Sequence, residues 1–387
     1  MRSFTWEMAC RRRLAHQHLL TPALPDQMID AVRAVGGIQA QILSAAELAI
    51  GTRVANITRQ DVQAALWERH ALVKTYGPRG TLHLLPADEL PLWMAALREA
   101  ERLNGGSWYQ RAGIEPAQGE ALLAAIAESL DGRRLTRKEL ADDVARHVGE
   151  WARKPLLSAW GELLYPAAVA GKLCFGPGNG SQVTFVRADQ WIGHWDDHDP
   201  RESLVELCRR YIAAYAPATH QDIAHWFRLK PDQARELLES LAAELEEVDF
   251  IGRCAWMLAS DAQNHTQEVN EPSSGALRLL PQYDCYLLGS GPRERVVPAA
   301  ARPRVNTYGR GRFEGATALS VVLVEGVVAG MWERRTSGRK PTGTGDLRVE
   351  MFGQLTPGQR EQLEAEVIRV SAFLGVDLAF SLGVLGE

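Results

Sequence analysis

The sequence predicts an α+β protein in which helices followed by a β-hairpin occur three times before a β-rich C-terminal region. Two observations support this prediction. Pairs of strand-like runs around glycine-containing turns follow helical stretches, and the pattern T-x-x-[DE]-[LI]-A starts two of those stretches. The chain has 387 residues, 46% hydrophobic and 24% charged, which suits two or three globular domains. Helix, helix and hairpin in this order are typical of a winged helix-turn-helix.

The first unit is predicted at residues 1–115. Its expected elements are, in chain order, helices over 8–20, 26–35, 38–48 and 61–69 and strands over 71–76 and 81–85. Thr58 is a suitable N-cap for the fourth helix. Gly77-Pro78-Arg79-Gly80 lies between the two strands and predicts the turn of a hairpin.

The second and third units are predicted at residues 116–200 and 201–270. Thr136 and Thr219 each stand three positions before an acidic residue, which is the capping box that starts a helix. The elements expected in these units are helices over 136–147, 156–164 and 231–246 and strands over 172–175, 182–185, 247–251 and 255–258. Together the three units predict tandem winged helices.

Residues 271–387 are predicted to form a mixed, β-rich lobe, with 270–274 as the junction. The expected elements are strands within 277–288, 318–324, 326–332 and 347–352 and a terminal amphipathic helix over 356–374. Glu325-Gly326 is typical of a tight hairpin turn. Thr356 followed by proline predicts a capped start for the last helix.

Charge is distributed unevenly along the chain. The formal net charge is −5, which by itself argues against a nucleic-acid partner. Residues 189–271 carry 7 Lys and Arg against 17 Asp and Glu, whereas residues 291–350 carry 11 against 6. The C-terminal lobe therefore offers a basic face that a polyanion would meet, and the acidic middle is expected away from it.

Several protein classes are excluded by what the sequence lacks. No apolar run approaches the roughly 20 residues that span a bilayer, and no secretory apolar core follows the early arginines, so a cytoplasmic location is expected. The five cysteines are widely spaced and are predicted to be buried, reduced thiols, with no metal bound. No phosphate-binding loop, zinc-protease, nucleophile-elbow or dinucleotide motif stands in a supporting context, so no cofactor is expected.

Two glutamines one residue apart, Gln39 and Gln41, stand at the start of the apolar helix predicted after Gly36-Gly37. On a regular helix their amides point about 200° apart, so only one faces a given pocket. From the spacing alone, the favoured interpretation is that both amides bond local backbone groups near the glycines.

Three segments in order carry a resemblance: GGIQAQ at 36–41, LVKT with RGTLHL at 72–84, and LPQYDCYLL at 280–288. They are similar to a bacterial family, the winged-helix DNA glycosylases of the AlkZ/YcaQ type, and the resemblance covers nearly the whole chain. It implies three tandem winged helices in a C-shaped scaffold around DNA. The family signature is Gln, an apolar residue, then Gln or Asp, so the resemblance makes Gln39 and Gln41 the catalytic pair. The Gln–Gln form resembles the branch acting on bulky alkyl lesions and interstrand crosslinks.

The implied reaction is hydrolysis of an N-glycosidic bond through an oxocarbenium-like sugar. An N7-alkylated guanine is already cationic and leaves as a neutral base without a proton donor. Amides that orient water and stabilise the sugar cation are then sufficient. The expected protein is a monofunctional glycosylase, monomeric, bound to double-stranded DNA that carries alkylated bases or crosslinks.

Other candidate residues have a functional and a structural interpretation. Arg79 and His83 lie in the first predicted hairpin, and the resemblance makes them neighbours of the lesion. Asp284 is expected to be a buried, hydrogen-bonded structural residue. The basic residues of the lobe suit phosphate binding or a solvated surface equally well; they are Arg302, Arg304, Arg310, Arg312, Arg334, Arg335, Arg339 and Lys340.

Two functions other than that of a glycosylase are also compatible with the sequence. Winged helices serve non-catalytic DNA-binding proteins, such as regulators, more often than enzymes. A scaffold that binds protein through its acidic middle is the second rival. The Gln39–Gln41 pair favours the enzyme, because a regulator has no use for paired amides away from its recognition helices.

Overall fold

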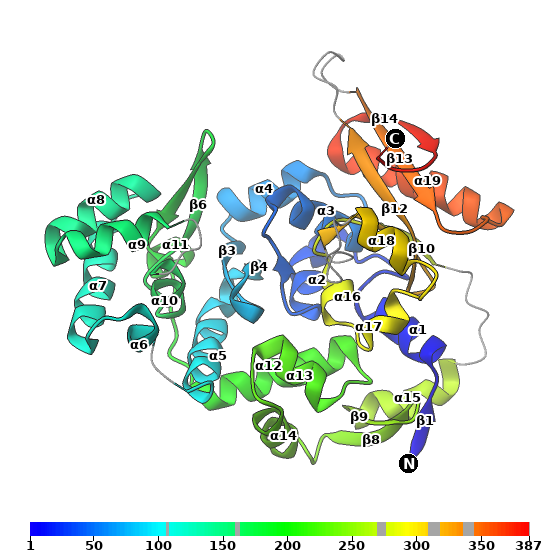
Figure 1. The fold of residues 1–387 in the computed structure, drawn as a ribbon, viewed down its shortest axis with the longest axis horizontal. Coiled ribbons are helices and arrows are strands. Elements are labelled where there is room, and N and C mark those ends of the chain that lie inside the picture. The colour runs from blue at the N-terminus through cyan, green and yellow to red at the C-terminus, as the bar shows by residue number, and fades with distance from the viewer. Residues whose placement is uncertain (106–107, 159–162, 269–275, 309–317, 336–343, 387) are drawn as a thin grey trace. The chain divides into compact units, whose positions relative to one another are not determined.

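The computed structural model describes residues 1–105, 108–158, 163–268, 276–308, 318–335 and 344–386. Helices and strands alternate along the chain (Figure 1), which confirms the mixed α and β class. The chain divides into two compact units. Unit 1 comprises Met1–Gln63, Arg209–Asp222 and Leu241–Glu387, and unit 2 comprises Ala64–Cys208 and Ile223–Ser240.

Unit 1 contains the N-terminal helices, the C-terminal lobe and two sheets. Its elements are β1 (Arg2–Phe4), α1 (Trp6–His16), η1 (Pro25–Gln27), α2 (Met28–Ala34), β2 (Ile38–Gln39), α3 (Leu43–Arg53), β8 (Leu245–Phe250), β9 (Arg253–Leu258), α15 (Ala259–Glu268), β10 (Leu277–Leu280), α16 (Cys285–Gly289), α17 (Arg293–Val296), α18 (Arg302–Tyr308), β11 (Val321–Val324), β12 (Val327–Arg335), β13 (Thr344–Met351), α19 (Pro357–Leu374) and β14 (Asp377–Leu382). Three helices run across the boundaries of the units: α4 (Arg59–Trp67), α12 (Pro200–Tyr215) and α13 (His220–Phe227).

The early arginines stabilise the start of unit 1. Arg12 and Arg13 are 3% and 1% exposed, although both carry full charges. Arg13 donates from Nε to the Tyr215 carbonyl and from Nη2 to the Pro217 carbonyl, both at 2.9 Å. Arg12 donates to the Ala213 carbonyl at 2.9 Å. These bonds satisfy carbonyls at the C-terminal end of α12 and just after it, where helical partners are missing.

Two sheets belong to unit 1. The first has the order β1-β8-β9, in which β1 pairs with β8 in parallel and β8 forms a hairpin with β9. The second has the order β10-β11-β12-β13-β14 and is antiparallel except between β13 and β14. Glu325 and Gly326, at the β11–β12 turn, both have positive φ, at 50° and 84°. This confirms the tight turn predicted there.

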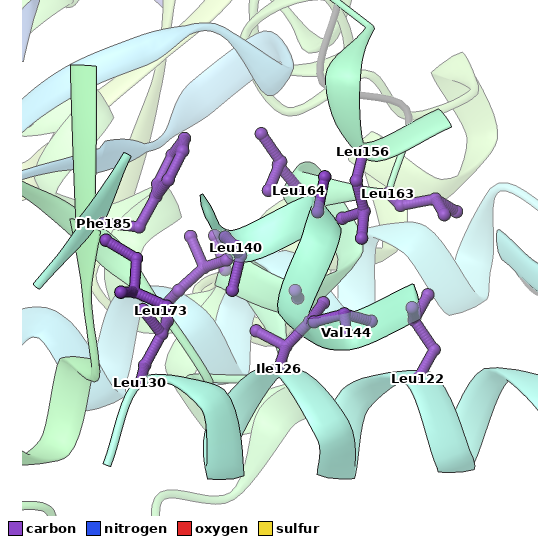
Figure 2. Close-up of a cluster of buried hydrophobic side chains, with 14 of the residues drawn as sticks. Leu122, Ile126, Leu130, Leu140, Val144, Leu156, Leu163, Leu164, Leu173 and Phe185 are labelled. Carbon is purple, nitrogen blue, oxygen red and sulfur yellow. The ribbon is translucent and has the colours of Figure 1, made fainter. Parts of the chain in front are cut away.

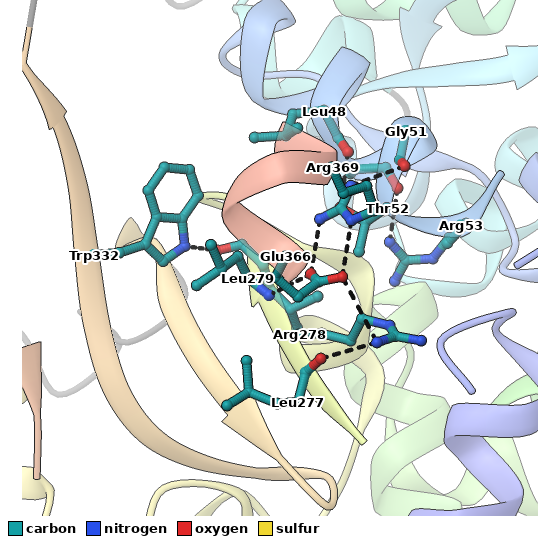
Figure 3. A network of polar contacts seen from close by, with 12 residues as sticks. Leu48, Gly51, Thr52, Arg53, Leu277, Arg278, Leu279, Trp332, Glu366 and Arg369 are labelled. Carbon is teal, nitrogen blue, oxygen red and sulfur yellow. Dashed lines mark hydrogen bonds and ion pairs between the residues drawn. The ribbon is translucent and has the colours of Figure 1, made fainter. Parts of the chain in front are cut away.

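Helix α19 fixes α3 to the second sheet through polar bonds (Figure 3). Arg369 donates to the Gly51 carbonyl at the end of α3 and to the carboxylate of Glu366, all at 2.9 Å. Glu366 in turn accepts the Leu279 N–H of β10 at 2.9 Å. A Cβ on Gly51 would lie 2.3 Å from the Phe373 ring, so only glycine allows this close approach. The helix that follows the glutamines is thus held at its far end.

Unit 2 combines helices and strands around a hydrophobic cluster. Its elements are β3 (Leu72–Tyr76), η2 (Pro78–Gly80), β4 (Leu82–Pro86), η3 (Ala87–Glu89), α5 (Leu90–Leu103), α6 (Trp108–Ala112), α7 (Pro116–Ser129), β5 (Leu135–Thr136), α8 (Arg137–Val148), η4 (Glu150–Ala152), α9 (Arg153–Leu157), α10 (Leu164–Val169), β6 (Cys174–Asn179), β7 (Gln182–Val186), α11 (Ala188–Ile192) and α14 (Pro231–Ser240). Strands β4, β3, β6, β7 and β5 are neighbours in that order. Figure 2 shows Leu122 and Ile126 of α7, with Leu130 just after that helix, turned toward Leu140 and Val144 of α8.

Capping boxes start α4, α8 and α13. Thr58, Thr136 and Thr219 each accept the backbone N–H three residues on, at 3.2–3.3 Å. The acidic side chain at that position accepts the threonine N–H at 2.7–2.9 Å. The two predicted boxes are confirmed, and the N-cap predicted at Thr58 is a third box of the same kind.

The predicted helix over 38–48 is wrong at its start. Gly36 and Gly37 have φ of 71° and 86°, and after this turn the chain runs extended as β2. Helix α3 begins only at Leu43, with Ile42 extended before it. The glutamines therefore precede the helix, and the 200° separation expected of them does not apply.

The predicted strand over 277–288 is also too long. Strand β10 ends at Leu280, because Pro281 has no N–H for a ladder and Tyr283 has a positive φ of 60°. Asp284 then caps α16. The cysteines are all unpaired thiols, as predicted, but Cys254 on the edge strand β9 is exposed rather than buried. The junction predicted at 270–274 lies outside the described residues.

Candidate functional site

The segment from Val35 to Ile42 contains two glutamines that differ in solvent exposure. Gln39, at the end of β2, is 6% exposed, whereas Gln41 is exposed in the turn before α3. Ala40 between them is completely buried. Because protein interiors are closely packed, a small residue suits this buried position. The segment thus offers one amide to solvent and fixes the other.

A buried ion pair lies at the other end of α3. Arg53 and Asp284 are 1% and 0% exposed and form two parallel bonds of 2.7 and 2.8 Å. Burial by itself lowers the pKa of Arg53, but the adjacent Asp284 carboxylate reverses this and raises it. Asp284 also accepts the Tyr286 N–H at 2.9 Å. The expectation of a buried, hydrogen-bonded structural Asp284 is confirmed.

Tyr215 forms a hydrogen bond to the backbone just before the glutamine segment. Its hydroxyl donates to the Val35 carbonyl at 2.9 Å, immediately before the two glycines. The ring is 1% exposed, and burial raises the pKa of this phenol well above its usual value. A neutral, buried hydroxyl therefore fixes the backbone at the entrance of the turn.

A cavity of about 310 Å³ adjoins the same turn. Its lining comes from the start of α3, from α4, from the segments after β10 and before β11, from β12 and from the end of α19; it comprises Ile42, Ser44, Ala45, Leu48, Arg59, Pro281, Gln282, Leu319, Ser320, Trp332, Glu333, Arg334 and Leu374. Trp332 donates from its indole to the Leu280 carbonyl at 3.0 Å, which fixes its ring (Figure 3). The cavity combines apolar walls with hydrogen-bond donors.

Arg79 and His83 both belong to unit 2. The Arg79 guanidinium lies 4.3 Å over the Trp226 ring, a cation–π contact. His83 is 1% exposed and donates from Nδ1 to the Thr81 carbonyl at 2.9 Å. Burial, and after it the nearby Arg79, lower the pKa of His83 to about 3, so the ring is neutral at physiological pH.

The basic residues of the lobe differ in their surroundings. Arg302 donates to the carbonyls of Val297 and Glu294, at 3.2 and 2.9 Å. Arg304 donates to both carboxylate oxygens of Glu350, at 2.5 and 2.7 Å. Burial alone would raise the pKa of Glu350, but the Arg304 bonds outweigh it and lower that pKa. Both arginines are engaged within unit 1.

Strand β12 carries two further basic residues at its end. Arg334 and Arg335 are exposed, and Arg335 pairs with Glu333 at 2.7 Å. Arg334 lines the cavity beside the glutamine turn. Arg310, Arg312, Arg339 and Lys340 lie outside the described residues.

Sequence reasoning missed Glu47, Arg59 and Gln63. Glu47 on α3 is 0% exposed and accepts Arg59 Nε at 2.6 Å and Gln63 Nε2 at 3.1 Å. The signal was a carboxylate within the apolar run that follows the glutamines, since buried acids almost always have partners.

The part of the chain that the structure describes has neither a cluster of metal ligands nor a helix suited to span a membrane. There, no group of three or more His, Cys, Asp and Glu is arranged to hold a metal ion. None of the helices in those ranges combines the length and apolar character needed to cross a membrane.

Comparisons with known proteins agree with one another. A model of the AlkZ-like DNA glycosylase family matches residues 32–373. A Streptomyces sahachiroi protein named interstrand DNA cross-link repair glycosylase is 33% identical over 338 residues, covering 85% of this chain and 88% of that protein. The solved structure of Streptomyces sahachiroi DNA glycosylase AlkZ matches with a TM-score of 0.79 at 28% identity, over 98% of this chain and all of that one. The chain belongs to the AlkZ-like DNA glycosylase family.

Proposed function

We propose that this protein hydrolyses the N-glycosidic bond of N-alkylated purines, of the N7-alkylguanine type, in duplex DNA, and that it unhooks interstrand crosslinks. The observation that carries the proposal is the glutamine segment itself: an exposed Gln41 beside a buried Gln39, on a backbone fixed by Tyr215, at the rim of a cavity. The printed name of the Streptomyces sahachiroi relative supports the crosslink part.

The chemistry of the lesion explains why amides suffice. An N7-alkylated guanine carries a positive charge and leaves as a neutral base, so no general acid is required. Gln41 would accept a hydrogen bond from the attacking water through its carbonyl oxygen and orient that water toward C1′ of the sugar, and the proton that the water loses passes to solvent. Gln39 would hold its carbonyl dipole toward the developing sugar cation, where a fixed dipole in a water-poor site is most effective. The enzyme is then monofunctional, because no amine attacks the sugar.

We further propose that the fold comprises three winged-helix units at 1–115, 116–200 and 201–270, in a C-shaped arrangement with the lobe at 271–387. The capping boxes of α4, α8 and α13, each followed along the chain by a hairpin, support the repeat. The protein is expected to act as a monomer on DNA in the cytoplasm.

For DNA contact we propose Arg334 and Arg335, together with Arg310, Arg312, Arg339 and Lys340. Arg302 and Arg304 hold the lobe instead, since their guanidiniums are bonded within it. We also propose that Arg79 and His83 lie near the lesion. Because His83 is neutral, it would contact the lesion without donating a proton as an acid.

The proposal is tested with duplex DNA that carries one N7-alkylguanine. Incubation followed by mild alkali should give more strand cleavage at the lesion with active enzyme than without it, because enzymatic release of the base leaves an abasic site and spontaneous release is slower. A duplex crosslinked through two N7-alkylguanines should separate into two strands. Binding without strand cleavage in either substrate would favour a DNA-binding protein without catalysis.

A further inference from the structure

The cavity beside the glutamine turn is lined by groups that donate hydrogen bonds. Arg59 and Arg334 bring guanidiniums from α4 and β12, and Ser44, Gln282 and Ser320 bring hydroxyls and an amide. The walls between them are apolar, with Trp332 only 6% exposed. Several donors that line one cavity can bind a single anion together, and bonds from guanidiniums to an anion are stronger than bonds between neutral groups.

Arg59 is oriented by a buried carboxylate. Glu47 occupies its Nε at 2.6 Å and is itself held by Gln63. Across the residues that the structure describes, the two terminal nitrogens of Arg59 make no hydrogen bond, and its side chain is 45% exposed. The ion pair therefore fixes the arginine through Nε and leaves its two terminal nitrogens open to a ligand.

Arg334 completes the donor set. Its guanidinium has no ion pair or hydrogen bond to any described residue, and its side chain is exposed. Glu333 also lines the cavity, but Arg335 engages its carboxylate at 2.7 Å. The carboxylate of the cavity lining is thus paired, and Arg334 contributes a positive charge that no described carboxylate offsets.

We infer that this cavity binds one phosphodiester group of the DNA strand that carries the lesion. The inference rests on the proposed function. A cationic alkylated base would be repelled by two guanidiniums, whereas a phosphate accepts bonds from all five donors. Because Ile42 and Ser44 of the lining follow Gln41 directly, the phosphate held here would set the register of the sugar against the glutamines.

The test combines protein variants with DNA duplexes in which a single phosphate is replaced by an uncharged methylphosphonate. Arg334→Ala and Arg59→Gln are prepared, the second retaining an amide donor for Glu47. Arg253→Ala is the matched control, since Arg253 is 56% exposed and paired with Glu294 on a different sheet. Affinity for one lesion duplex is measured against salt, and again with single methylphosphonates placed at each position around the lesion.

Each cavity variant should weaken binding roughly tenfold at low salt and reduce the slope of log Kd against log salt by about 0.9. Arg253→Ala should change neither quantity. One particular methylphosphonate should weaken the wild-type complex but have little further effect on Arg334→Ala, because the contact is already lost.

Wild-type slopes in both cavity variants, or methylphosphonate effects that add fully to the substitutions at every position, would overturn the phosphate site. These are binding measurements, so they are separate from failure of the proposed function. That failure would appear as wild-type protein releasing no base from any alkylated duplex. Circular dichroism verifies that Arg59→Gln is folded. If Arg59→Gln unfolds, the result for Arg334→Ala alone decides whether the cavity binds a phosphate.

Discussion

Two glycine-containing turns, one in each unit, hold polar side chains in opposite ways. In unit 1 the Gly36-Gly37 turn leads to Gln41, which is exposed next to a cavity. In unit 2 the turn after Gly77 leads to His83, which is buried and neutral. A Cβ on Gly77 would lie 2.8 Å from the His83 ring, so this turn is closed around its polar residue.

The difference between the turns lies in what satisfies the polar groups. His83 bonds to the neighbouring Thr81 carbonyl within its own hairpin. The glutamine segment instead receives support from Tyr215, far away in sequence, which leaves the exposed amide of Gln41 available to a ligand. A polar residue supported by distant groups and open to a cavity is a better functional candidate than one that bonds locally.

The largest expected effect concerns the ion pair that stabilises the glutamine region. Asp284→Asn keeps an acceptor for the Tyr286 N–H but leaves the buried Arg53 without a counter-charge. The free energy of unfolding should fall by about 3–5 kcal/mol, measured by urea denaturation. Asp30→Asn, which breaks an exposed pair with Arg33, should cost less than about 1 kcal/mol. Equal losses in the two variants would contradict a special role for the buried pair.

Gln41→Ala should have the next largest effect, on rate rather than stability. Loss of a dipole that acts in the transition state costs about 10²–10³ in rate, although a lesion that leaves readily reduces this. DNA affinity should remain nearly unchanged. Single-turnover release of one N7-alkylguanine is the measurement.

Two further variants sharpen this prediction. The double variant of Gln39 and Gln41 to Ala should lose less than the product of the single losses, because both amides act in one transition state. Gln41→Asp should stay active, because a carboxylate also accepts a hydrogen bond from the attacking water. Parental rates in both single Ala variants would make the glutamines structural, like His83.

The buried histidine should make stability depend on pH. The folded-state pKa of His83 is about 3, whereas the unfolded chain titrates near 6.5. Below about pH 6.5 this histidine binds a proton in the unfolded chain but not in the folded protein. The free energy of unfolding should therefore fall as pH falls, by up to about 1.4 kcal/mol per pH unit. His16, whose pKa burial lowers to about 4, adds to this loss.

Urea midpoints between about pH 7 and pH 4 separate these contributions. His83→Gln should show a flatter pH dependence than the parent protein. His194→Gln, at an exposed position, should follow the parent. A His83→Gln profile parallel to that of the parent would contradict a neutral, buried ring.

Local signals made the helix starts and hairpins predictable. Thr136 and Thr219 need only an acidic residue three positions later, and Glu325-Gly326 needs only two positions that accept positive φ. Nothing in the local pattern signalled that the chain leaves the glycine turn extended, so the predicted start of helix α3 was too early by several residues. Asp284 became a helix cap rather than a strand residue for a related reason.

The site was predicted only in part for the same reason. The motif identified Gln39 and Gln41, but not that one is buried and the other exposed. Glu47 and Arg59 are 12 positions apart, and no local pattern signals their bond. Arg53 and Asp284 are 231 positions apart, so only the folded chain reveals the pair.

The smallest expected effect, and the closest test of the comparison, is Tyr215→Phe. It removes one hydroxyl and leaves the Val35 carbonyl without its 2.9 Å bond, at a cost of about 1–3 kcal/mol in stability. Base release should slow several-fold at saturating enzyme, because the turn before Gln39 loses its fixed position. Introduced into the Gln41→Ala background, the same change should leave the residual rate almost unaltered, since the aligned amide is already absent. Tyr211→Phe, which removes a buried hydroxyl bonded at 2.9 Å to Gly289, is the matched control and should lower stability without slowing base release. If Tyr215→Phe slows release equally in both backgrounds, the tyrosine supports the fold as a whole and not the glutamine segment.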